Sequence, residues 1–179
     1  MKTRREFVQG LIFSVGGASL LSACGDVASI VATAPGESGR FYNNEEMAQI
    51  SRISDLIIPR TETPGALDAN VPGYLDALMS DWAREETRIG HREALKLITA
   101  RLDDISGDFA GASEADANIA LAELDAIAFA GDEALIGYRT LKGYVTQAYF
   151  ATEEGAMEEL QWLAMPGHWD PSVNITIED

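Results

Sequence analysis

Apolar residues recur at spacings of three and four along most of the chain after residue 43, which is the pattern of amphipathic helices. From this pattern we expect five helices, at roughly 44–57, 71–82, 85–105, 114–129 and 133–150. A short acidic helix is expected within 153–163, followed by an irregular tail. Only 173–177 alternates with the period of a strand. The sequence therefore predicts an all-α fold, a compact bundle of about five to six helices joined by short connections.

Capping and breaking residues mark the ends of these helices. Asn43 or Asn44 is the candidate N-cap of the first helix, and Pro59 ends that helix. Gly107 is suited to follow the third helix, and Ser113 opens a loose capping box before the fourth. The fourth helix is rich in alanine, and we expect its apolar stripe to consist of Ile119, Leu121, Leu124, Ile127, Ala128 and Phe129.

The start of the chain breaks the helical pattern. No charged residue lies between Glu6 and Asp26, and the apolar core of this stretch, 10–23, is about 14 residues long. As a helix it would cover roughly 21 Å of a hydrocarbon layer that is about 30 Å thick. That length is typical of the core of a signal peptide, and Lys2, Arg4 and Arg5 supply the basic flank.

The segment Thr3-Arg4-Arg5-Glu6-Phe7 resembles the twin-arginine export signal, in which Ser or Thr, two arginines, any residue and Phe precede a modest apolar core. That route carries proteins that have already folded. Arg4, Arg5 and Phe7 are therefore the expected residues of the export signal. The alternative is an ordinary signal peptide that contains two arginines by chance.

The apolar stretch ends in Leu21-Ser22-Ala23-Cys24, which resembles a bacterial lipobox. Cys24 is the only cysteine, so it has no internal disulfide partner, and we expect it to be lipid-modified after cleavage. The alternative is a plain signal peptide followed by a chance cysteine. The expected organisation is a lipoprotein signal peptide at 1–23, a flexible tether at 24–43 and a helical domain at 44–179.

Charge narrows the classes of partner. The whole chain has a formal net charge of −16, and 1–23 holds three bases and one acid, so the remainder has 10 bases, 28 acids and a net charge of −18. Such a chain is repelled by phosphate backbones, which argues against nucleic-acid binding. The acids have no EF-hand spacing, so a solvated acidic surface is favoured over a calcium site. A partner surface that touches this chain is expected to be neutral or basic.

The sequence offers little for catalysis. His91 lies within a charged stretch of the third helix, where we expect it to be solvated, and His168 lies in the tail. No spacing typical of zinc, iron–sulfur or c-type haem ligands occurs, and neither a dinucleotide fingerprint nor a P-loop is present. We therefore assign no catalytic, cofactor-binding or metal residue to this chain. An exported chain of this kind is expected to travel with a protein that does hold a cofactor.

The loop from Pro59 to Ala66, PRTETPGA, leads through Ala69-Asn70-Val71 into the second helix. This stretch resembles the gluconate 2-dehydrogenase subunit 3 family, with Asn70 where that family usually has glycine. Both residues tolerate a left-handed backbone, so the departure is mild. Leu141-Lys142-Gly143-Tyr144, Glu153-Glu154-Gly155 and Met165-Pro166-Gly167 resemble later parts of the family pattern, although Val145-Thr146-Gln147 departs from it. The resemblance covers roughly 44–170.

The resemblance implies a non-catalytic small subunit of a periplasmic FAD-dependent dehydrogenase. The FAD would lie in a large subunit of the glucose–methanol–choline oxidoreductase type, which oxidises a sugar, sugar acid or glycoside and often passes electrons to a cytochrome c. The small subunit would stabilise the large one and carry it through twin-arginine export. The alternatives are a free-standing helical lipoprotein that acts as an adaptor or binding module, and, with less support from its motifs, an enzyme in its own right.

The Pro-Gly loops are the candidate docking elements of such a subunit, because rigid loops lose little entropy on binding and aromatic residues often anchor interfaces. The alternative is that these loops only turn the chain between helices, and Tyr144 on its helix is equally suited to the core. The expected interface residues are Thr61, Thr63, Pro64, Gly65, Ala66, Tyr144, Trp162, Pro166, Gly167, His168 and Trp169.

Overall fold

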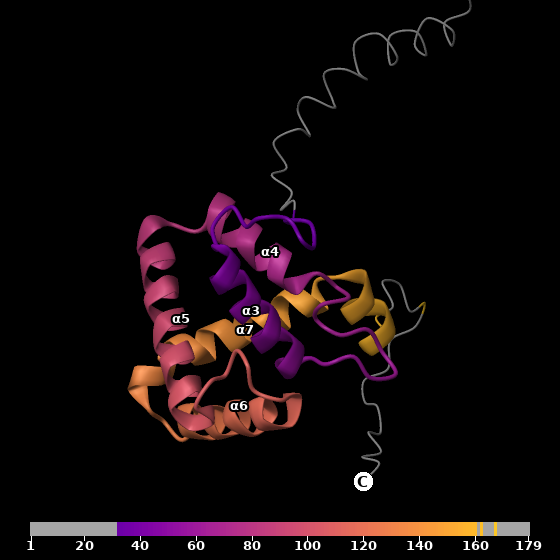
Figure 1. Cartoon of the computed structure of the whole chain (residues 1–179). Coiled ribbons are helices and arrows are strands. Elements are labelled where there is room, and N and C mark those ends of the chain that lie inside the picture. The colour runs from indigo at the N-terminus through magenta and orange to yellow at the C-terminus, as the bar shows by residue number, and fades with distance from the viewer. Residues whose placement is uncertain (1–31, 161, 163–166, 168–179) are drawn as a thin grey trace, which may run out of the picture. The chain divides into compact units, whose positions relative to one another are not determined.

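Residues 32–160, 162 and 167 are the part of the chain that the computed structural model describes (Figure 1). Every regular element among them is helical, which confirms the all-α prediction. The expected signal residues Arg4, Arg5 and Phe7 and the expected lipidation site Cys24 lie outside the described residues. The elements are α3 (Asn44–Ile57), α4 (Val71–Ala77), η2 (Leu78–Trp82), α5 (Glu85–Ser106), α6 (Glu114–Phe129), η3 (Glu133–Leu135), α7 (Ile136–Phe150) and η4 (Glu154–Glu159).

Local signals placed several helix ends correctly. Asn43 caps α3 through a full capping box, in which its side chain accepts from the backbone N–H of Glu46 and the Glu46 carboxylate accepts from the backbone N–H of Asn43. Ser113 caps α6 by accepting from the backbone N–H of Asp116. Gly107 follows α5 with a φ of 83°, a left-handed conformation that favours glycine. The second and fifth expected helices each contain a change of helix type, because α4 continues into the π-helical η2 and the 3₁₀ turn η3 precedes α7.

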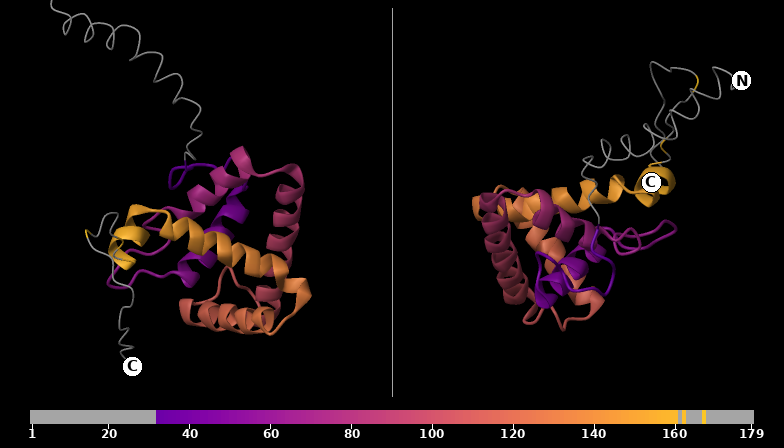
Figure 2. Two further views of the ribbon diagram at one scale, coloured as in Figure 1. Left: turned by 180° about the vertical axis from the view of Figure 1, so that it is seen from behind. Right: turned by 90° about the horizontal axis from the view of Figure 1, so that it is seen from above.

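The core forms where α7 packs against α3, α4, α5 and α6. Figure 2 shows α7 crossing this unit towards η4. A small residue permits the closest crossing, since a Cβ on Gly137 of α7 would lie 2.4 Å from the Cβ of Ala94 on α5. The fully buried aliphatic side chains at the centre include Ile50, Ile53, Leu75, Leu95, Ile98, Leu102, Leu124, Leu141 and Val145.

The prediction for α6 was partly wrong. Leu121, Leu124 and Ala128 are buried as expected, but Ile119 and Phe129 are 65% and 60% exposed and Ile127 is exposed too. Apolar residues lie on both sides of this helix, so their spacing alone does not select the side that packs. The side of α6 that packs into the core carries Ala117, Leu121, Leu124 and Ala128.

The expected tether needs correction over its second half. Within 32–43, Thr33, Phe41 and Tyr42 are buried, whereas residues 34–38 are exposed. Asp76 on α4 fixes this segment: its carboxylate accepts from the Thr33 hydroxyl at 2.6 Å and from the backbone N–H groups of Arg40, Phe41 and Tyr42 at 2.8–2.9 Å. The helical unit therefore begins near residue 32, before the predicted boundary at 44. Within the described residues, no helix is both long and apolar enough to span a membrane.

Candidate docking surface

The proline loop between α3 and α4 is held by a dense set of backbone hydrogen bonds. The N–H of Ala66 donates to the carbonyl of Ile58 at 2.8 Å, and the N–H of Val71 donates to the carbonyl of Ala66 at 2.9 Å. The N–H of Gly65 donates to the carboxylate of Asp68 at 2.8 Å. These bonds fold the loop back to the end of α3 and make it a fixed element.

Asn70 confirms the conformation expected at the position where the family usually has glycine. Its φ of 49° and ψ of 39° are left-handed, and it is the only residue other than glycine with a positive φ among the described residues. Its side-chain amide also donates to the carbonyl of Thr33 at 3.0 Å. Asn70 therefore ends the loop and ties it to the N-terminal segment.

Gly65 and Ala66, which we expected at the interface, are buried within the unit. A Cβ on Gly65 would lie 2.6 Å from the backbone nitrogen of Arg60 and 2.9 Å from the carbonyl oxygen of Ile58. Ala66 is fully buried. Both residues thus shape the loop from inside, and neither offers a surface to a partner.

The exposed part of the loop is joined to η4, although the two are far apart in the sequence. The hydroxyl of Tyr149 at the end of α7 donates to the carbonyl of Pro64 at 2.5 Å. The hydroxyl of Thr63 donates to the carboxylate of Glu159 on η4 at 2.7 Å. Figures 1 and 2 show the loop beside the yellow turn of η4.

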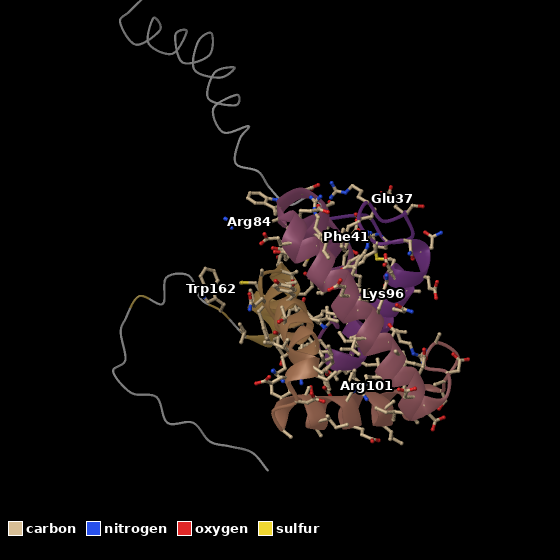
Figure 3. The ribbon with its side chains drawn as sticks, turned by 90° about the vertical axis from the view of Figure 1, so that its left-hand side faces the viewer. Glu37, Phe41, Arg84, Lys96, Arg101 and Trp162 are labelled. Atoms are coloured by element: carbon tan, nitrogen blue, oxygen red, sulfur yellow. The ribbon has the colours of Figure 1, made fainter. Side chains whose placement is uncertain are left out.

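Large apolar side chains are exposed next to this junction. Met157 and Leu160 on and after η4 are 52% and 57% exposed, and Trp162 is 58% exposed. Figure 3 shows Trp162 at the edge of the unit, directed away from the helices. We name this surface the loop face and define it by Thr61, Glu62, Thr63, Pro64, Phe150, Met157, Leu160 and Trp162.

Acids surround the loop face. Glu153, Glu154, Glu158 and Glu159 lie on or beside η4, and Glu62 belongs to the loop face itself. The nearby Arg60 is paired with Asp68, and this hydrogen bond, together with the one from Gly65, lowers the pKa of the Asp68 carboxyl. An apolar centre with an acidic rim is suited to a partner with an apolar centre and a basic rim.

The remaining expected interface residues lie elsewhere or outside the described part. Tyr144 is half-buried on α7, where its ring lies 6.2 Å from that of His91 on α5, and not at the loop face. Gly167 is exposed. Pro166, His168 and Trp169 lie outside the described residues.

His91 was expected to be solvated and is instead 8% exposed. Its Nε2 lies 2.5 Å from the hydroxyl oxygen of Tyr42, a residue 49 positions earlier in the chain. Burial, with the nearby charge of Arg92, lowers the pKa of His91 to about 4, although Glu46 opposes this shift. The imidazole is therefore neutral near pH 7 and belongs to the core.

Asp76 is a buried carboxylate that no pattern in the sequence distinguishes from the solvated acids. It is fully buried, and burial alone would raise its pKa, but the hydrogen bonds from Thr33 and the backbone of 40–42 outweigh this effect and lower it. The hydrogen-bond partners of its carboxylate, Thr33 and the backbone of 40–42, belong to the N-terminal segment, so its role is to hold that segment. No three acidic, histidine or cysteine side chains converge on a possible metal position in the part of the chain that the structure describes.

The sequence model of gluconate 2-dehydrogenase subunit 3 matches residues 44–167. The chain belongs to this family. The match includes the proline loop, α7 and η4, which are the elements of the loop face. Members of the gluconate 2-dehydrogenase subunit 3 family are subunits of a dehydrogenase complex. Comparisons with curated proteins and with solved structures gave no match.

Proposed function

We propose that this protein is the non-catalytic small subunit of a periplasmic FAD-dependent dehydrogenase that oxidises a sugar, sugar acid or glycoside. The family membership carries this proposal. The large subunit of the glucose–methanol–choline oxidoreductase type holds the FAD, and a cytochrome c subunit accepts the electrons. The small subunit stabilises the flavoprotein by covering an apolar part of its surface.

The loop face is the first docking element in this proposal. Its proline loop is fixed by internal hydrogen bonds, so little conformational entropy is lost when it binds. Trp162 is an exposed aromatic side chain of the kind that anchors interfaces. The acidic rim would steer a basic partner surface into place.

Co-expression with the large subunit tests the proposal. We expect a tag on this chain to recover a complex whose absorption spectrum contains flavin, while this chain expressed alone is colourless. The large subunit expressed alone should hold less flavin and melt at a lower temperature than the large subunit in the complex. A large subunit that is equally stable, flavin-loaded and active without this chain would contradict the proposed role.

Export and anchoring are tested separately. Replacing Arg4 and Arg5 with lysine should leave both subunits in the cytoplasm, because the large subunit is carried by the signal of the small one. Cys24→Ala should release the complex from membranes, if lipid is the tether. Normal periplasmic dehydrogenase activity in the double lysine variant would overturn the proposed export route without affecting the subunit assignment.

A further inference from the structure

The outer side of α6 carries an apolar seam that nothing in the described chain covers. Its residues are spaced by four, three, four and three positions, and all of them are exposed: Ala115, Ile119, Ala122, Ala126 and Phe129. The opposite side of the same helix has the spacing four, three and four in the buried residues Ala117, Leu121, Leu124 and Ala128. One helix therefore has two apolar seams, and the core uses only one.

The outer seam has the geometry of a helix–helix contact. Alternating spacings of four and three keep apolar residues on one line along a helix, which is how paired helices meet. The three alanines permit close approach, and Ile119 and Phe129 provide larger side chains near the two ends. A helix that is apolar on both sides is normally buried on both sides. Figures 1 and 2 place α6 at the edge of the unit.

A hollow lies beside the middle of the seam. It has a volume of about 200 Å³ and is lined by residues of three helices, including Leu56 of α3, Ala122 of α6 and Lys142 of α7. Lys142 bonds to Asp125 at 2.6 Å and lies 5.2 Å from the ring centre of Phe129. The hollow beside Ala122 offers space for a side chain of a docked helix.

Charge argues against a second copy as the occupant. α6 contains no lysine or arginine, and its seam is flanked by Asp116, Asn118, Glu123 and Asp125. Two copies would set acids against acids along the contact, since residues that flank such seams face one another. Asp125 is neutralised by Lys142, but within the described residues Glu123 forms no ion pair. A partner helix with lysine or arginine beside its seam is complementary.

The loop face is too small to form a permanent subunit interface by itself, so the large subunit is expected to contact a second surface of this unit. A standard interface of about 1,600 Å² takes roughly 20–30 residues from each side, and permanent subunit contacts are larger. The loop face has far fewer residues than that. An additional surface on this unit is needed, and the outer seam of α6 is a long apolar surface of suitable form.

We propose that the outer seam of α6 docks an apolar helix of the large subunit, flanked by lysine or arginine. This inference rests on the proposed function and adds a second docking surface to it. The contact buries Ile119 and Phe129 and places Glu123 opposite a basic residue.

Binding of the purified large subunit to the full chain, measured by calorimetry, tests the seam. Ala122→Glu changes an exposed alanine in the middle of the seam and should weaken binding at least about tenfold. Ala100→Glu makes the same change at an exposed site on α5 and should alter binding less than about twofold. Glu123→Lys should also weaken binding, because it sets like charges together. Circular dichroism should show unchanged helix content in every variant.

The failures are distinguishable. If the wild-type chain bound the large subunit and Ala122→Glu and Ile119→Glu bound equally well, the seam proposal would be wrong while the subunit assignment stood. If the wild-type chain formed no complex, the proposed function itself would fail. If the chain alone were a dimer that Ala122→Glu made monomeric, the seam would belong to a second copy and the proposal would be overturned.

Discussion

The hydroxyl of Tyr42 and Nε2 of His91 lie 2.5 Å apart, and both side chains are buried. Tyr42 lies near the end of the N-terminal segment and His91 lies on α5, so this contact joins the start of the unit to one of its longest helices. The charged groups that act on the imidazole are Glu46 and Arg92, and the rings of Phe41 and Tyr144 lie beside it. The neutral imidazole is the form that this environment stabilises.

The first prediction is a loss of stability in mild acid. Burial lowers the pKa of His91 from 6.5 to about 4, so the unfolded chain binds an additional proton between these values. The stabilisation is complete above pH 6.5 and falls as the pH decreases towards 4, by up to about 1.4 kcal/mol for each pH unit. Urea unfolding of the chain lacking 1–23, at a series of pH values, measures this slope.

His91→Gln should flatten that slope between pH 6.5 and 4, because glutamine does not titrate. Tyr42→Phe is the companion variant, since it keeps the titrating imidazole but removes its hydrogen-bond partner. It should be less stable by about 1–3 kcal/mol at pH 7. An unchanged slope in His91→Gln would assign the acid sensitivity to other groups.

The second prediction concerns the buried carboxylate of Asp76. Asp76→Ala removes the acceptor for the Thr33 hydroxyl and three backbone N–H groups, and should lower the free energy of unfolding by about 3 kcal/mol or more. Thr33→Val removes one of these bonds and should lower it by only about 1 kcal/mol. Hydrogen exchange should become fast at the amides of residues 40–42 in Asp76→Ala. If these amides were as well protected as in the wild type, Asp76 would not be what holds the N-terminal segment.

Local signals explain what the sequence predicted well. Asn43, Ser113 and Gly107 act through neighbours within about one helical turn, so their capping roles are readable from nearby residues. The left-handed backbone of Asn70 agrees with the family resemblance, in which glycine is usual at this position.

The features that the sequence did not predict depend on partners far away in the chain. Asp76 bonds to residues 34–43 positions away, so no local spacing distinguishes it from the many solvated acids. His91 looks solvated among its charged neighbours, but its burial depends on Tyr42, which lies 49 positions away. On α6, periodicity predicts two equally apolar sides, and only packing in three dimensions selects one.

The third prediction concerns Gly65. A Cβ there would approach backbone atoms of Ile58, Pro59 and Arg60 within 3.0 Å, and the backbone cannot move aside as a flexible side chain can. Gly65→Ala should therefore lower the melting temperature, and the fold rather than docking is its first target. Gly90→Ala on α5 is the control, because an added Cβ there meets open space. This variant should stabilise the protein by about 0.5–1 kcal/mol. Equal melting temperatures for the two variants would show that the backbone around Gly65 accommodates a Cβ, and would contradict this prediction.

The fourth prediction separates a docking tryptophan from an exposed one. Trp162 beside η4 and Trp82 at the end of η2 have nearly equal exposure, at 58% and 51%. Neither lies in the core, so replacing either with alanine should leave the melting temperature almost unchanged. If the loop face binds the large subunit, Trp162→Ala should weaken that binding by about 2 kcal/mol or more, as anchors at interface centres do.

Trp82→Ala is the matched control and should change binding by less than about 0.5 kcal/mol, because Trp82 is not part of the loop face. Calorimetry at two salt concentrations adds a second readout. The acids on and around the loop face, including Glu62, Glu158 and Glu159, should make the wild-type affinity fall as salt increases. Equal affinities for the two tryptophan variants would show that the loop face is not the interface, because the two side chains are similarly exposed and only Trp162 belongs to the loop face.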